Sequence, residues 1–220
     1  MPRDSLPKDV MSDFQLQILS TDQLLKQPAV LHAVVSLVNA AYLDHKIFNG
    51  TLRFDSDDRL CSELGQGLCA VLLDRESYAV ATASVKMWTK EEKENIERLH
   101  GSVFEVQSGR RFTYEKDASN QYHFELAAVA SRNDHQYRKK GLIEQCVKAL
   151  ESHLMKQLST DEMDIQLTFW VRVVADINGE YWRRKGFCEF GQGRMMPKGT
   201  WRADEPFLFI AMNKSVTKIG

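Results

Sequence analysis

The chain of 220 residues lacks several features that would place it in a specialised class of proteins. No apolar run approaches the roughly 18 residues needed to cross a bilayer, and the N-terminal residues lack the apolar core of a signal peptide. We therefore expect an intracellular, cytoplasmic protein with no membrane partner, and a nuclear location is compatible with the same features. Repeats and low-complexity segments are also missing, so the length predicts one large domain.

An excess of charge of either sign is missing as well. The formal net charge is −1 at pH 7, which argues against a general polyanion binder and so against a nucleic-acid partner. The 4 cysteines form no Cys-x-x-Cys pair and the 6 histidines have no ligand spacing, so we predict no metal site. Hydrophobic residues make up 43% of the chain, which is enough for a full core.

Alternating and helical patterns of apolar residues divide the chain into strands and helices. Strands are predicted at residues 14–18, 68–73, 78–88, 122–130, 165–173 and 207–212. Helices are predicted at residues 29–45, 55–63 and 142–158. These elements together predict a mixed α/β sheet of six or seven strands with helices on both faces.

The ends and the middle of the chain depart from this regular pattern. Residues 1–12 are polar with two prolines, so we expect a flexible N-terminus before a single domain at 13–215. Residues 89–121 form an insertion between two strands, for which we predict a charged helix and an extra hairpin. A connection of this length is either a surface embellishment or a lid or dimer contact that shapes a pocket.

The most informative segment lies between the strand at 122–130 and the helix at 142–158. It reads Tyr-Arg-Lys-Lys-Gly-Leu-Ile from Tyr137 to Ile143. The unpaired N–H groups of a first helical turn and the positive end of the helix dipole attract anions. The segment therefore predicts an anion site for which phosphate is the natural occupant. It has neither the Walker A pattern nor the Gly-x-Gly-x-x-Gly pattern.

The same segment resembles the Gln/Arg-x-x-Gly-x-Gly/Ala motif of the GCN5-related N-acetyltransferases, the GNAT family. Arg138 and Gly141 match the motif, whereas Ile143 stands where the family has Gly or Ala. Two further segments resemble the family in the same order along the chain. They are Leu37–Tyr42, in the first long helix, and Asp176–Phe187, with its asparagine, aromatic pair and terminal Gly-Phe. The resemblance spans roughly residues 14–213 and implies a GNAT-like, mostly antiparallel sheet.

In the GNAT family the matching motif holds the pyrophosphate of acetyl-coenzyme A (acetyl-CoA). The resemblance therefore implies acetyl-CoA as co-substrate, with the pantetheine arm between two splayed strands. Main-chain groups of Val129 and Ala130 would pair with the pantetheine amides, and one of these residues would donate to the thioester oxygen. The other expected cofactor contacts are Arg138, Lys139, Lys140, Gly141, Leu142, Ile143, Asn178 and Trp182.

Acid–base residues for acyl transfer are also implied by the resemblance. A lysine-type amine with a pKa near 10.4 is almost wholly charged at pH 7, so a general base helps. Glu125 is the candidate base; a solvent-facing position or an ion pair with an arginine is the alternative, and His123 is a second candidate. Tyr181 is the candidate acid for the leaving thiolate, because Trp182 occupies the position where the family has tyrosine. Water is the alternative source of that proton.

The leading hypothesis is an acetyl-CoA-dependent N-acetyltransferase that acts on a primary amine of a small molecule or amino acid. The near-neutral charge favours a small acceptor, because a basic protein tail would prefer a distinctly acidic face. A protein lysine or N-terminus is the alternative acceptor. A noncatalytic acyl-CoA-binding domain on the same fold, or an unrelated α/β domain, are the alternatives to an enzyme. A homodimer is compatible with the resemblance, although no sequence feature decides it.

Overall fold

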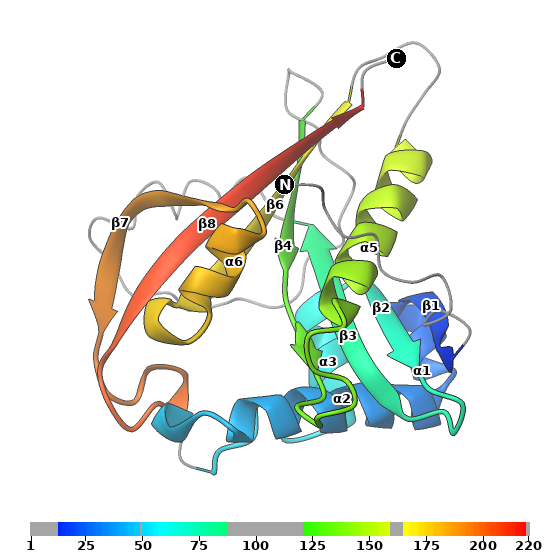
Figure 1. Cartoon of the computed structure of the whole chain (residues 1–220), viewed down its shortest axis with the longest axis horizontal. Coiled ribbons are helices and arrows are strands. Elements are labelled where there is room, and N and C mark those ends of the chain that lie inside the picture. Colours follow the sequence, from blue (N-terminus) through cyan, green and yellow to red (C-terminus); the bar gives the residue numbers. More distant parts are fainter. Residues whose placement is uncertain (1–12, 49, 88–120, 159–164, 219–220) are drawn as a thin grey trace.

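The computed structural model describes residues 13–48, 50–87, 121–158 and 165–218. These residues build an eight-stranded sheet in the order β1-β2-β3-β4-β6-β8-β7, with β5 paired to β3 (Figure 1). The strands are β1 (Gln15–Ser20), β2 (Leu68–Leu73), β3 (Ala79–Met87), β4 (Gln121–Leu126), β5 (Ala130–Ser131), β6 (Ile165–Val174), β7 (Cys188–Met196) and β8 (Phe207–Lys218). Among the described strands, only β4 and β6 pair in parallel. The predicted mixed, mostly antiparallel sheet is confirmed.

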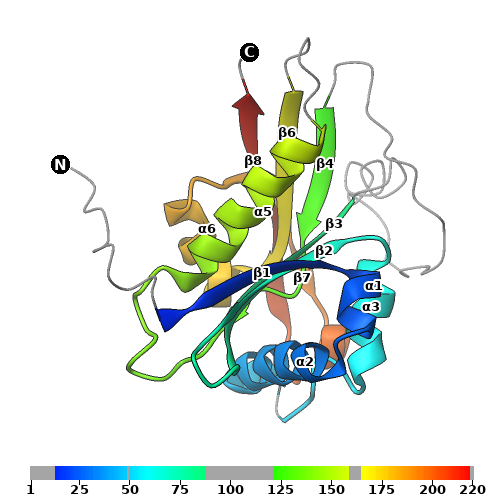
Figure 2. The same ribbon diagram turned by 90° about the vertical axis from the view of Figure 1, so that its right-hand side faces the viewer.

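Helices cover both faces of the sheet (Figure 2). The long helix α5 (Leu142–Leu158) and the short helix α6 (Glu180–Arg184) lie on one face. The other face carries α1 (Thr21–Leu25), α2 (Pro28–Leu43) and α3 (Asp57–Leu64). Short helical turns are η2 (Lys46–Phe48), η3 (Ala175–Gly179) and η4 (Thr200–Arg202). None of the helices in the described ranges is long and apolar enough to span a membrane.

Each face of the sheet has its own apolar core. Beneath α5, the helix buries one stripe against the inward side chains of β2, β3 and β6, among them Leu72, Val85 and Leu167. The buried residues of that stripe are Leu142, Cys146, Val147, Leu150 and Leu154. The predicted helical period is therefore confirmed. Beneath α2, Val34 and Val38 pack towards Val71 of β2 in a second core. Each such large side chain contributes about 1.5–3 kcal/mol on burial.

Two predicted segments lie outside the described residues. They are the flexible N-terminus at residues 1–12 and nearly all of the insertion at residues 89–121, with its predicted helix and hairpin. The described strands on either side of the insertion, β3 and β4, pair with each other through Val85↔Leu126. The insertion therefore begins and ends at one end of a strand pair in the middle of the sheet.

The strand predicted at residues 122–130 is interrupted, which corrects the sequence prediction. β3 pairs with β4 at Val85↔Leu126 and with β5 at Thr82↔Ala130. Between these two pairs β3 advances by three residues, whereas the segment from β4 to β5 advances by four. The segment after Leu126 therefore carries one extra residue. The extra residue is a β-bulge, of the kind that re-aims the backbone next to active sites. Ala127 keeps the chain on β3, because its N–H donates to the Ser84 carbonyl at 2.8 Å.

The C-terminus of α6 ends in a glycine cap. Gly186 has φ of +83°, its N–H donates to the Arg183 carbonyl at 3.0 Å, and the N–H of Phe187 donates to the Trp182 carbonyl at 3.1 Å. This bond pair is the Schellman motif. The cap turns the chain so that Phe187 enters the core at 4% exposure.

Replacement of this glycine isolates the conformational cost of the cap. We expect Gly186→Ala to lower the free energy of unfolding by about 1 kcal/mol, because an L-residue is strained at this φ. A Cβ at Gly186 would meet no heavy atom within 4 Å, so no clash adds to this cost. Urea unfolding measures the change. Gly186→Asn, which tolerates the left-handed region better, is the matched control and should lose less. Equal stability of wild type and Gly186→Ala would contradict the assignment.

Candidate functional site

The basic loop before α5 has the geometry of an anion site. Lys139 and Gly141 both have positive φ, at 58° and 63°, on either side of Lys140. Such turns aim successive N–H groups to one side and form anion-binding concavities. Within the described part of the chain, no backbone carbonyl accepts a hydrogen bond from the N–H groups of residues 139–142. These groups, at the positive end of a 17-residue helix, are available to an anion.

The side chain of Arg138 is held in place by a short relay of hydrogen bonds. Its Nε donates to Oδ1 of Asn133 at 2.9 Å. The Nδ2 of Asn133 in turn donates to Oδ2 of Asp44, the residue that caps the C-terminus of α2, at 3.2 Å. The relay therefore links the basic loop before α5 to the C-terminus of α2. An oriented guanidinium can meet a phosphate with a bidentate pair of hydrogen bonds.

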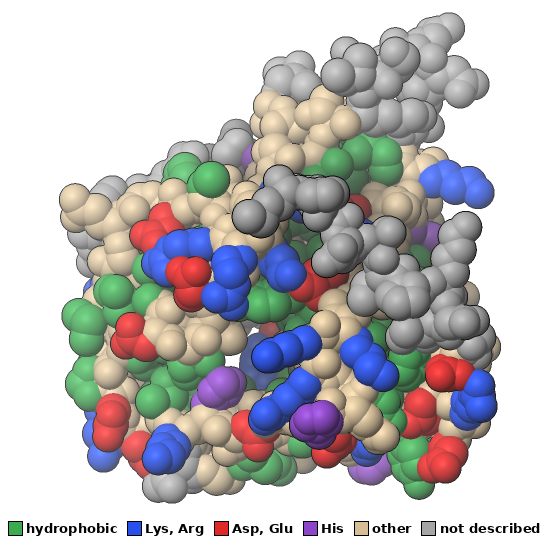
Figure 3. Space-filling view, viewed as in Figure 1, with side chains coloured by type: hydrophobic (Ala, Val, Ile, Leu, Met, Phe, Trp, Pro, Cys, Tyr) green, Lys and Arg blue, Asp and Glu red, His purple; other side chains and the backbone are tan. Residues whose placement is uncertain are grey.

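Lysine and arginine side chains gather in the middle of one face of the molecule (Figure 3). Figure 1 places the loop before α5 and the helix α6 in this region. The cations of α6 are already paired, since Arg183 contacts Glu180 and Glu189, and Lys185 contacts Glu144. Lys139 and Lys140, by contrast, make no ion pair among the described residues. The loop lysines are therefore the cations best placed to meet an additional negative charge.

Strands β4 and β6 part at a defined position. Their pairing runs from Gln121↔Gln166 to Glu125↔Trp170 and stops there. β6 continues to Val174 in register with β8, while the chain of β4 passes through the bulge into β5, which pairs with β3. The main chain at Val129 and Ala130 thus lies beyond the point of separation. This is the arrangement expected if a ligand arm enters between the strands, as predicted for these two residues.

Glu125 lies at the last position of β4 that pairs with β6, buried at 5% exposure. Its Oε1 accepts from Nη2 and Nε of Arg172 at 2.6 and 2.7 Å, and its Oε2 lies 3.2 Å from Nζ of Lys86. Burial alone would raise the pKa of Glu125, but the charges of Arg172 and Lys86 outweigh it and hold that pKa below its usual range. A carboxylate that binds its proton so weakly is poorly suited to act as a general base near neutral pH.

His123, the second candidate base, lies two residues before Glu125 on the same strand. The Nε1 of Trp170 donates a hydrogen bond to its Nδ1 at 3.1 Å. Since Nδ1 accepts in this bond, the ring is the neutral tautomer that carries its proton on Nε2. Proton uptake at Nδ1 would require the loss of the Trp170 bond, so this geometry does not favour His123 as a base either.

Tyr181 and Trp182, predicted as acid and cofactor contact, pack towards α5. Trp182 is 5% exposed and makes edge contacts with Phe187 and Tyr181 at 4.9 and 5.1 Å between ring centroids. Burial and the negative charge of Glu144 raise the pKa of Tyr181, which makes its phenol a weaker acid. The third predicted contact of this segment, Asn178, is exposed in η3. The described environment therefore supports core packing for Trp182 more directly than cofactor contact.

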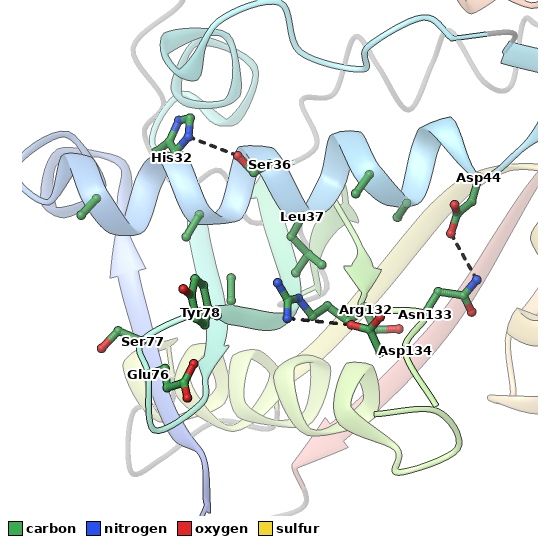
Figure 4. Close-up of a pocket in the computed structure, with 16 residues that line it drawn as sticks. His32, Ser36, Leu37, Asp44, Glu76, Ser77, Tyr78, Arg132, Asn133 and Asp134 are labelled. Atoms are coloured by element: carbon green, nitrogen blue, oxygen red, sulfur yellow. Dashed lines mark hydrogen bonds and ion pairs between the residues drawn. The ribbon is translucent and has the colours of Figure 1, made fainter. Parts of the chain in front are cut away.

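A groove of about 990 Å³ lies beside the basic loop, between α2, the turn before β3 and the residues after β5 (Figure 4). Its charged lining consists of the acids Asp44, Glu76 and Asp134 and the base Arg132, besides His32. Arg132 pairs with Asp134 at 3.8 Å and lies over the ring of Tyr78. The excess of acids makes this groove unsuitable for a pyrophosphate, so we place the anion at the loop and not in the groove.

Comparisons with solved structures identify the fold. The chain aligns with Arabidopsis thaliana NAA60 in complex with acetyl-CoA at 11% identity and a TM-score of 0.56, over 92% of this chain and 98% of that one. The Escherichia coli ribosomal-protein-S18-alanine N-acetyltransferase aligns at 16% identity and 0.54, over 94% and 96%. The chain has the GNAT fold. The Salmonella typhimurium protein yncA with its cofactor acetyl-CoA also aligns, at 14% identity and 0.54, over 94% and 96%.

The likeness to these structures holds at low sequence identity. No protein-family model and no curated protein matches the sequence. The aligned structures cover more than nine-tenths of this chain, so the fold accounts for the whole described sheet and not for one part of it. At these identities the likeness carries the fold alone, and function has to be argued from the residues of this chain.

Three residues of the site were not singled out by the sequence reading. Lys86 and Arg172 pair with Glu125, and Asn133 orients Arg138. A signal for the first two is present in the sequence, because each is a single cation inside an otherwise uncharged strand. A charge in such a strand requires a partner when it is buried, and Glu125 is the acid in the neighbouring strand.

Proposed function

We propose that the protein is an acetyl-CoA-dependent N-acetyltransferase that acts on a primary amine of a small molecule or amino acid. One observation supports the proposal: a basic loop with two residues of positive φ lies at the start of α5, in a GNAT fold whose strands β4 and β6 part after Glu125. The loop would hold the pyrophosphate through the N–H groups of residues 139–142. Arg138, Lys139 and Lys140 add charge-assisted bonds to its oxygens.

The reaction is a direct transfer between the two substrates. The amine nitrogen attacks the thioester carbonyl carbon, the carbon–sulfur bond breaks, and the products are an amide and the coenzyme A thiol. Main-chain N–H groups near Val129 stabilise the negative charge that develops on the carbonyl oxygen. The pKa of Glu125 is lowered and that of Tyr181 is raised. Water is therefore favoured over Glu125 as the acceptor of the amine proton and over Tyr181 as the donor to the thiolate. The role predicted for Glu125 is tested by the variants described below. The role predicted for Tyr181 is tested by Tyr181→Phe, which should keep most of the acetyl-transfer activity of the wild type.

The acceptor has one specific alternative. The Escherichia coli neighbour is named for a protein substrate, an alanine of ribosomal protein S18, so a protein N-terminus is the second candidate acceptor. The near-neutral charge of this chain supports the small-molecule acceptor, because it provides no general attraction for a basic protein tail. A noncatalytic acyl-CoA-binding domain is the remaining alternative on the same fold.

The proposal is tested by two measurements on the purified protein. Calorimetric titration with acetyl-CoA should give micromolar binding, and thiol release should then be measured with panels of free amines, amino acids and short peptides with an N-terminal alanine. Turnover with a free amine would support the small-molecule acceptor. Turnover with peptides alone would support a protein N-terminus as the acceptor. Binding without thiol release from any amine would identify a noncatalytic domain. No binding would contradict the proposal.

The relay that orients Arg138 allows a finer test of the cofactor loop. We expect Asn133→Ala to raise the Kd for acetyl-CoA by about three- to tenfold, because Arg138 loses the hydrogen bond that fixes its guanidinium. Titration calorimetry measures the change. Gln136→Ala, an exposed residue of the same loop, is the control and should bind like wild type. An unchanged Kd for Asn133→Ala would mean that Arg138 does not contact the ligand.

A further inference from the structure

Three charged side chains from adjacent strands contact one another where β4 and β6 separate. Glu125 belongs to the last residue pair that joins the two strands, Glu125↔Trp170. Arg172 lies two residues beyond that pair on β6, in the part of the strand that has left β4. Lys86 lies directly opposite Glu125 on β3. The three residues therefore come from three adjacent strands and meet at one level of the sheet.

The contacts among these side chains bridge the separation. Two nitrogens of Arg172, Nη2 at 2.6 Å and Nε at 2.7 Å, reach back from β6 to a single oxygen of Glu125. The second oxygen of Glu125 faces Nζ of Lys86 at 3.2 Å. The side chains of Lys86, Glu125 and Arg172 are 10%, 6% and 19% exposed. Such burial reduces the screening of these charges by solvent, so the ion pairs hold the three side chains together.

We infer that Lys86, Glu125 and Arg172 form a clamp that sets the separation of β4 and β6 and so positions the bulged main chain at residues 127–129 against the thioester. The clamp residues are positioning residues and do not exchange protons with the substrate. The inference rests on the proposed acetyl transfer. It follows from chain connectivity, because the bulge begins two residues after Glu125 and its first N–H is fixed to β3 at Ser84.

A general base at Glu125 is the competing interpretation, and the two differ in pH dependence. Among the residues that the structure describes, the ionisable groups that contact Glu125 are Lys86 on β3 and Arg172 on β6, and His123 lies two residues earlier on the same strand. A base would supply the acidic limb of the pH–kcat/KM profile. Removal of a nearby cation would raise the pKa of that base and move the limb to higher pH. If Glu125 only holds the strands and stays ionised, the acidic limb of the profile stays at the same pH.

The test uses Glu125→Gln, Arg172→Lys and the double variant in the full chain. We expect each single variant to lower kcat by roughly 10- to 100-fold, since small displacements of a reacting group have effects of this size. The KM for acetyl-CoA and the acidic limb should change little. The double variant should lose no more than the worse single variant, because both break one unit. Arg172→Met, which keeps the length but not the charge, should lose more than Arg172→Lys.

Amide hydrogen exchange gives a readout that does not depend on turnover. In Glu125→Gln the N–H of Ala127, which donates to Ser84, should exchange faster than in wild type. The N–H of Arg132, at the far end of β5 on Val80, should change less. A displaced acidic limb in Arg172→Met, or wild-type kcat in Glu125→Gln, would overturn the clamp. A wild-type protein that neither binds acetyl-CoA nor releases thiol would overturn the proposed function instead, while the exchange rates would still test the clamp.

Discussion

Gly141→Asp is expected to abolish measurable binding of acetyl-CoA at concentrations where the wild type saturates. Gly141 has φ of +63° and lies between the three basic residues at 138–140 and the first turn of α5. An added carboxylate would place a negative charge among the N–H groups that are proposed to hold the pyrophosphate. Two unit charges 4 Å apart interact by about 4 kcal/mol at an effective dielectric constant of 20, so we expect a loss of about 100-fold or more.

The matched control for this variant is Gly141→Asn. Asparagine and aspartate are the non-glycine residues that tolerate the left-handed region best, and they have the same shape. Both variants should therefore carry the same cost in stability, about 1 kcal/mol, and differ only in charge. Calorimetry should give a weakened but measurable affinity for Gly141→Asn and none for Gly141→Asp. Equal affinities in the two variants would place the pyrophosphate away from the loop.

Features with a local cause were predictable from the sequence. The buried stripe of α5 follows from the spacing of its leucines, and the cap at Gly186 follows from a glycine after a run of cations. A capping box at Ser20 and Gln23 begins α1, with the Gln23 N–H donating to Oγ of Ser20 and the Ser20 N–H donating to Oε1 of Gln23. Each of these needs only residues a few positions apart, so periodicity and propensity are sufficient to find it.

Features that depend on distant partners were not predictable in the same way. The bulge after Leu126 is one extra residue in the segment that pairs with β3. The segment Ala127–Ala130 has no glycine or proline to mark it. The role predicted for Glu125 came from its position in a strand. Its actual environment comes from Lys86 and Arg172, which lie about 40 residues away on either side along the chain. Such a pairing becomes visible only once the order of the strands is known.

Burial of α6 explains why the prediction at Trp182 is the least supported of the cofactor contacts. The position matches the family motif in sequence, and the cap at Gly186 fixes the helix end. The same cap brings Phe187 back beneath the helix, where its ring meets that of Trp182 at 4.9 Å. The indole is then 5% exposed and mostly unavailable to a ligand. Trp182 is therefore better suited to holding α6 against α5.

The largest expected change in stability is that of Glu125→Gln. Removal of one partner from a buried ion pair typically costs about 3–5 kcal/mol, so we expect a loss of about 3 kcal/mol in the free energy of unfolding at pH 7. Glu63→Gln is the control, because Glu63 pairs with Arg53 where both side chains are partly exposed, at 23% and 38%. Such a pair contributes about 1 kcal/mol or less. Urea unfolding of the three proteins at one pH makes the comparison.

The pH dependence of this loss separates charge from shape. The pKa of Glu125 is lower in the folded protein than its usual value of 4.5, so the stability due to its ionised form is complete above that value and is lost as the pH falls through the folded pKa. Protonated glutamate and glutamine have nearly the same shape and are both neutral. The difference between wild type and Glu125→Gln should therefore shrink steadily as the pH is lowered below 4.5. If the difference is the same at pH 7 and in acid, the clamp is held by packing and not by charge, and the ion pairs that define it contribute no net stability.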